Sequence, residues 1–97
     1  MRITSVRINL LLPPKGSIRA FASVIFDDFL MIRDFKIIDS RRGVFVSYPS
    51  KKITDGVYRE VIQSMNSDAD RTIKDAIMRA YEDELARPEN KIQPSAC

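Results

Sequence analysis

Alternating apolar and polar residues dominate the first third of the chain and predict β-strands. Residues 2–12 form the first predicted strand, one face of which carries Thr4, Val6, Ile8 and Leu10. The run Pro13-Pro14-Lys15-Gly16 should end this strand in a loop. A second strand follows over residues 18–26, and one of its faces carries Ile18, Ala20, Ala22, Val24 and Phe26.

The next segment predicts a third strand with an irregularity. Asp27-Asp28 is a plausible two-residue connection between strands, although it is a weaker hairpin signal than Asp-Gly. Residues 29–38 are rich in apolar side chains, and their alternation slips near Arg33-Asp34. A slip of this kind predicts a β-bulge or a strong local twist.

The middle of the chain predicts two shorter strands. Ser40–Gly43 reads as a turn, and the apolar run Val44–Val46 is typical of a strand covered on both faces. Pro49 ends that strand because proline cannot donate to the ladder. Asp55-Gly56 is a strong turn signal, and Val57–Ile62 should return as a further edge strand.

The hydrophobic period then changes from that of a strand to that of a helix. A helix over residues 67–86 would be roughly 30 Å long, with Ser67 as its N-cap. Its apolar stripe consists of Ala69, Ile73, Ala76, Ile77, Ala80, Tyr81 and Leu85. Pro88 follows, and we expect residues 87–97 to be a disordered tail. The pattern predicts an α+β domain over residues 1–86, an antiparallel sheet of about five strands followed by one C-terminal amphipathic helix.

The predicted sheet carries more apolar positions than one helix can cover. Phe21 and Ile25 fall on the face opposite to Val24 and Phe26. Because the chain offers only one clear helix, we expect a second copy to cover the remainder, which predicts a homodimer.

The composition narrows the class of protein. Of the 97 residues, 44% are hydrophobic and 30% charged, as in ordinary globular proteins. The apolar runs are too short for a membrane span, and the start of the chain does not read as a signal peptide. The one cysteine, Cys97, excludes an internal disulfide. We therefore expect a cytoplasmic protein without membrane contact.

Catalytic chemistry finds little support in this sequence. Histidine is absent, and Cys97 has no nearby group to activate it. Asp27-Asp28 could bind a metal, but adjacent turn carboxylates are far more often a solvated turn. The glycines are too dispersed for a phosphate loop. We expect no enzymatic activity, no cofactor, no metal and no small-molecule substrate.

The charge is uneven along the chain. Residues 33–59 contain seven basic and three acidic residues, a balance of +4, whereas residues 60–97 contain five basic and eight acidic residues, a balance of −3. Such a basic segment favours an anionic partner. The candidate phosphate-binding residues in it are Arg41, Arg42, Lys51, Lys52 and Arg59. The alternative is that these pairs only make the loops soluble.

Two further candidates lie beside this segment. On the helix, Lys74 and Arg79 each follow an aspartate by four residues and should pair with it. Arg71 lacks such a partner, so it is the helical residue most free to contact a phosphate. Tyr48 and Tyr58 could stack on unpaired bases, although burial in the sheet is at least as plausible for both.

Several motifs resemble the bacterial stage V sporulation protein G (SpoVG, septation protein) family. The resemblance covers roughly residues 1–85 and rests on Ile3-Thr-Ser-Val-Arg7, Phe35-Lys-Ile-Ile-Asp39, Gly43-Val-Phe-Val, Pro49-Ser-Lys-Lys, Asp55-Gly56, Tyr58-Arg59-Glu60-Val61 and Asn66. The chain departs from the family pattern at Arg33, Thr54 and Gln63-Ser64. The resemblance implies a dimer that binds DNA and RNA and regulates sporulation, septation and gene expression. The other hypothesis is a protein–protein interaction module of the division or developmental machinery that does not bind nucleic acid.

Overall fold

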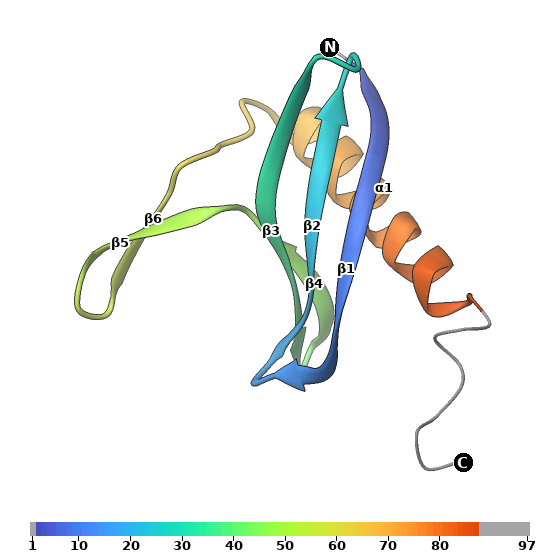
Figure 1. Cartoon of the computed structure of the whole chain (residues 1–97). Coiled ribbons are helices and arrows are strands. Elements are labelled where there is room, and N and C mark those ends of the chain that lie inside the picture. Colours follow the sequence, from blue (N-terminus) through green and yellow to red (C-terminus); the bar gives the residue numbers. More distant parts are fainter. Residues whose placement is uncertain (1, 88–97) are drawn as a thin grey trace, which may run out of the picture.

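The computed structural model describes residues 2–87 and contains one four-stranded sheet, one two-stranded sheet and one helix in that range (Figure 1). In chain order the elements are β1 (Ile3–Lys15), β2 (Ile18–Phe26), β3 (Leu30–Ser40), β4 (Gly43–Ser47), β5 (Ser50–Thr54), β6 (Val57–Glu60) and α1 (Ser67–Leu85). The predicted α+β class is therefore confirmed. The predicted tail lies outside the described residues, apart from Arg87.

The larger sheet is an antiparallel meander in the order β1-β2-β3-β4. Each strand pairs with the next along the chain, so short turns suffice to connect them. Helix α1 lies diagonally behind this sheet and covers one of its two faces (Figure 1). The other face of the sheet is not covered by any element of residues 2–87.

The first turn differs from the prediction. β1 continues through Pro13 and Pro14 to Lys15, and the chain reverses only at Gly16-Ser17. The prolines fit because β1 is an edge strand and its register with β2 shifts between Leu10 and Lys15, where no ladder donor is needed. Gly16 supplies the positive φ of 61° that the turn requires.

The second turn and the bulge agree with the sequence. Asp27 and Asp28 both have positive φ, 54° and 52°, a conformation that aspartate tolerates. Phe29 belongs to this turn, so β3 starts one residue later than predicted. Ala22 pairs with Phe35 and Val24 with Ile32, which leaves one extra residue on β3 at Arg33-Asp34. This is the predicted bulge.

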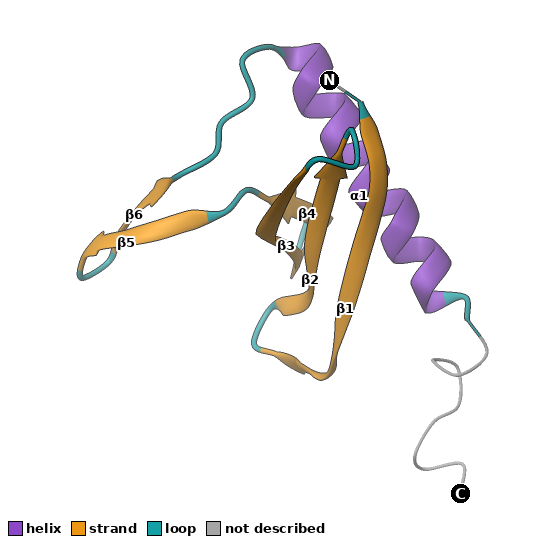
Figure 2. Ribbon diagram, turned by 45° about the horizontal axis from the view of Figure 1, so that its top comes forward, coloured by secondary structure: helices purple, strands orange, loops and turns teal. Residues whose placement is uncertain are grey.

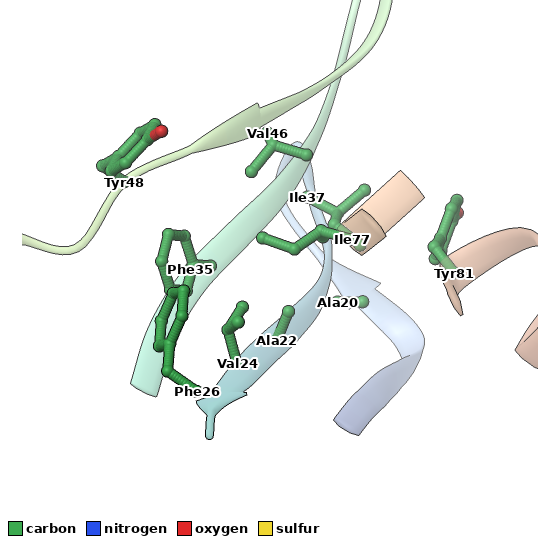
Figure 3. Close-up of a cluster of buried hydrophobic side chains, with 10 residues drawn as sticks. All are labelled: Ala20, Ala22, Val24, Phe26, Phe35, Ile37, Val46, Tyr48, Ile77 and Tyr81. Carbon is green, nitrogen blue, oxygen red and sulfur yellow. The ribbon is translucent and has the colours of Figure 1, made fainter. Parts of the chain in front are cut away.

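The hydrophobic core lies between α1 and the covered face of the sheet (Figure 3). The buried residues are Ala20, Ala22, Val24, Phe26, Phe35, Ile37, Val46, Tyr48, Ile77 and Tyr81. The two alanines on the central strand leave room for the helix to approach, and Ile77 fills that space beside Ile37 (Figure 3). The face of β2 that carries alternate apolar residues is therefore the core face, as predicted.

The helix starts with a different cap from the one predicted. Asn66, not Ser67, is the N-cap, because its side-chain Oδ1 accepts a hydrogen bond of 2.8 Å from the Ala69 N–H. Ser67 is already the first helical residue. The helix ends at Leu85, one residue short of the predicted end.

The strands are divided between two sheets, where the sequence predicts one sheet of about five strands. Residues 50–54 form a strand, β5, which pairs with β6 in a separate sheet. This hairpin projects sideways from the body of the molecule (Figure 2). We call residues 50–60 the arm. The face of β4 opposite to the core is uncovered, so Phe45 is exposed, contrary to the prediction for residues 44–46.

Candidate nucleic-acid interface

The arm is a short antiparallel hairpin whose residues are all exposed. Pro49 precedes it and interrupts the ladder of β4, while its carbonyl accepts a hydrogen bond of 2.9 Å from the Val61 N–H. Asp55-Gly56 forms the turn at the tip, with Gly56 at a φ of 77°. These two ends fix the register of the arm.

The register brings two of the predicted binding residues together. Lys51 is the direct cross-strand partner of Arg59, so both side chains stand on the same face of the arm. Neither has an ion pair within residues 2–87. Like charges directly opposite one another destabilise a strand pair. This pair is therefore a concentrated, uncompensated positive charge on a projecting element.

Lys52 is less available than the sequence indicates. It pairs with Tyr58 across the hairpin and stands on the other face of the arm from Lys51. Its Nζ atom lies 3.2 Å from Asp55 Oδ1 at the tip. This ion pair leaves Lys52 less free to contact a phosphate than Lys51.

Arg41 and Arg42 are not brought to the arm. They form the β3–β4 turn, in which Arg42 N–H donates to Ser40 Oγ at 3.3 Å. The five-residue strand β4 separates this turn from the start of the arm by roughly 17 Å. The two basic pairs thus lie at opposite ends of β4.

The end of the sheet that carries Arg41 and Arg42 holds further cations. The β1–β2 turn joins it, because the Asp39 N–H donates to the Ser17 carbonyl at 2.8 Å. Arg19 forms an ion pair with Asp39, which raises the pKa of the guanidinium through their hydrogen bond. Lys15 is exposed beside this turn and is a cation that the sequence reasoning did not select.

Arg71 is exposed on α1 and has no ion pair in the described chain. Lys74 pairs with Asp70 at 3.3 Å, as predicted. The predicted pair between Asp75 and Arg79 is not formed. The helix therefore offers two unpaired arginines, not one.

For Tyr48 the sequence leaves two alternatives open, base stacking and burial, and the structure shows burial. It is only 5% exposed, and its ring packs edge-on against Phe35 with the centroids 5.4 Å apart. Its hydroxyl donates to Asp70 Oδ1 at 2.9 Å, and Lys74 Nζ lies 5.7 Å from its ring centroid. This contact joins the chain at the base of the arm to the first turns of α1. Tyr58, in contrast, is 63% exposed on the arm.

The pKa values of both groups in the Tyr48–Asp70 contact are shifted. The hydrogen bond from Tyr48 is the main cause that lowers the pKa of Asp70, with Lys74 and Ser64 adding to it. Burial is the main cause that raises the pKa of the Tyr48 hydroxyl. Both shifts favour the state in which a neutral hydroxyl donates to a carboxylate.

Comparison with known proteins decides the family. The sequence profile of the SpoVG family matches residues 1–83. The chain belongs to the SpoVG family. A SpoVG protein of Staphylococcus carnosus is 35% identical over 98 residues, covering 99% of this chain and 90% of the relative. One of Clostridioides difficile is 30% identical, covering 90% and 94% respectively.

A SpoVG protein of Symbiobacterium thermophilum is 39% identical over 82 residues, which are 84% of this chain and 58% of that relative. The chain thus spans little more than half the length of this last relative. All three relatives carry the name septation protein, so this chain belongs to a family associated with sporulation and septation. Helix α1 is not long and apolar enough to cross a membrane.

Proposed function

We propose that this SpoVG protein is a cytoplasmic regulator that binds DNA and RNA through the arm, without chemistry of its own. The observation that carries this proposal is the uncompensated Lys51–Arg59 pair. A phosphate held between the two cations would relieve their repulsion and gain charge-assisted hydrogen bonds. The phosphate backbone of a nucleic acid is therefore a ligand that suits this pair of cations.

The shape of the arm supports the same ligand. A two-stranded ribbon fits the major groove of B-DNA, and the arm projects from the body far enough to present both strands (Figure 2). Contacts to phosphate would supply most of the affinity, and they carry little sequence information. Arg41, Arg42 and Lys15 form a second cationic surface that a longer nucleic acid would reach at the other end of β4.

The experiment is an electrophoretic mobility assay with duplex DNA and with RNA at 50 mM and 200 mM salt. Binding that weakens steeply with salt supports the proposal. Absence of binding to both nucleic acids at the lower salt concentration would refute it.

A second function has an observation of its own in its favour. The arm carries apolar side chains that are about half exposed, Ile53 at 49% and Val57 at 50%. An isolated two-stranded hairpin is only marginally stable in water. We propose that a second copy of the chain packs against these side chains, which gives a homodimer. The cationic ends of Lys51 and Arg59 can still reach solvent in such a dimer, because long basic side chains extend past apolar surface.

A heterologous partner is the alternative occupant of this apolar surface. The chain would then be the protein–protein module of the second hypothesis. Light scattering separates the two, because a homodimer has twice the monomer mass of 11.1 kDa without any added partner. A monomer at that mass would leave the apolar surface to another protein.

A further inference from the structure

The face of the four-stranded sheet that α1 leaves bare contains a hollow. Its volume is about 330 Å³, at the lower end of the range for small-ligand sites. The main lining residues are Arg7, Asn9, Phe21, Ser23, Arg33 and Asp34. They come from β1, β2 and β3, so the hollow exists only in the folded sheet.

The strand register arranges these residues around one aromatic ring. Phe21 pairs with Asn9 on one side and with Lys36 on the other. In the adjacent row, Ser23 pairs with Arg7 and faces the bulge that contains Arg33 and Asp34. The bulge therefore places a cation and a carboxylate at the hollow that contains the ring.

The hollow is positively charged. Its lining contains two cations, Arg7 and Arg33, against the single acid Asp34, and Lys36 stands beside the hollow as the cross-strand partner of Phe21. None of these four side chains takes part in an ion pair in the part of the chain that the structure describes. Arg33 makes one weak contact, from its Nε to the Met31 sulfur at 3.5 Å. Cations without acidic partners around an accessible ring are suited to an aromatic ligand with negative charge.

We propose that this hollow binds an unpaired base of a single-stranded nucleic acid. The base stacks on Phe21, while Arg7, Arg33 and Lys36 hold the adjoining phosphates. Asn9, Ser23 and Asp34 supply donors and acceptors for the edge of the base. This inference rests on the proposed nucleic-acid binding and adds to it a surface that selects single strands.

Single strands are favoured because stacking on a side chain needs a base with a free face. In a duplex both faces of each base are covered by its neighbours, whereas unpaired bases can stack on aromatic rings. The arm, in contrast, contacts the backbone and can bind either form. Loss of the Phe21 ring should therefore weaken binding of single strands and leave binding of duplex unchanged.

A fluorescence experiment reports the stack directly, because the chain contains no tryptophan. Phe21→Trp places the only indole in the hollow, and Phe29→Trp places it in the β2–β3 turn, where Phe29 is 93% exposed. A mixed-sequence single-stranded RNA of about 20 nucleotides should quench the Phe21→Trp emission at saturation. The matched duplex should not quench it, and Phe29→Trp should respond to neither.

Affinity measurements complete the test. Phe21→Leu, which keeps an apolar side chain at this partly buried position, should lower the affinity for the single strand by roughly tenfold. Its affinity for the duplex, and both affinities of Phe29→Leu, should match the wild type. Unchanged single-strand affinity in Phe21→Leu, or an unquenched Phe21→Trp at saturation, overturns this inference alone. A wild-type chain that binds neither nucleic acid overturns the proposed function together with it.

Discussion

Replacing Tyr48 by phenylalanine removes one hydrogen bond and almost nothing else. The ring of Tyr48 is buried against Phe35, and its hydroxyl donates to Asp70 Oδ1 at 2.9 Å. Hydrogen bonds to charged groups contribute about 1.5–3 kcal/mol. Asp70 is partly open to solvent and keeps Lys74 and Ser64 as partners, so we place the loss at the low end, about 1.5 kcal/mol.

Thermal unfolding followed by circular dichroism measures this loss. For a domain of this size, 1 kcal/mol corresponds to about 4–8 °C, so a loss of about 1.5 kcal/mol in Tyr48→Phe should lower the Tm by about 6–12 °C. The control is Tyr58→Phe, which removes the same atom from an exposed ring and should leave the Tm within about 2 °C. Equal Tm values for Tyr48→Phe and wild type would contradict the account of this contact.

The same contact predicts a pH dependence. The Tyr48 hydroxyl lowers the pKa of Asp70 below its ordinary value of 3.8, so the contribution of this carboxylate is complete above that value. It is lost as the pH falls through the lowered pKa. Between pH 5 and pH 2 the wild type should therefore lose more stability than Tyr48→Phe. A parallel loss in both proteins would show that the pKa of Asp70 does not depend on Tyr48.

Three further predictions concern assembly, domain limits and the helix cap. Val57→Asp should convert the proposed homodimer to a monomer in light scattering, because it places a charge in the apolar surface of the arm; a wild-type-like mass would move the interface elsewhere. A chain ending at Arg87 should keep the Tm of the full chain within a few degrees, and a larger drop would assign a structural role to residues 88–97. Asn66→Ala should cost about 1 kcal/mol in urea unfolding and Ser67→Ala less than about 0.5 kcal/mol, because only Asn66 caps α1; the reverse order would contradict the assignment of the cap.

The sequence predicts the body of the fold well, because its strands are patterned by burial on one face. The alternate apolar residues of β2 become the centre of the core, and the slip at Arg33-Asp34 becomes the bulge. The arm was missed as a strand pair of its own because it is exposed on both faces, so burial leaves no alternation in its sequence. Its local signals were the turn at Asp55-Gly56 and the return strand predicted over Val57–Ile62, of which β6 forms residues 57–60.

The candidate site could be predicted only in part. Lys51 and Arg59 were selected by charge, but their direct opposition depends on the register of the arm. Tyr48 could not be assigned to the core from local pattern, because its partner Asp70 lies 22 residues away. The hollow on the bare face was not predicted for a similar reason, since Arg7, Phe21 and Arg33 meet only across three paired strands.

The most direct test of nucleic-acid binding through the arm compares two double variants with equal charge. Lys51→Ala with Arg59→Ala removes the cross-strand pair, and Arg71→Ala with Arg79→Ala removes the two unpaired arginines of α1. Duplex binding is measured by fluorescence anisotropy from 50 to 200 mM salt. The arm variant should lose affinity and flatten the log–log salt dependence by roughly two units per chain, since each lost phosphate contact removes about 0.9. The helix variant should lose less affinity and less slope than the arm variant, whereas a larger loss in the helix variant, with the arm variant binding as wild type, would place the interface on α1.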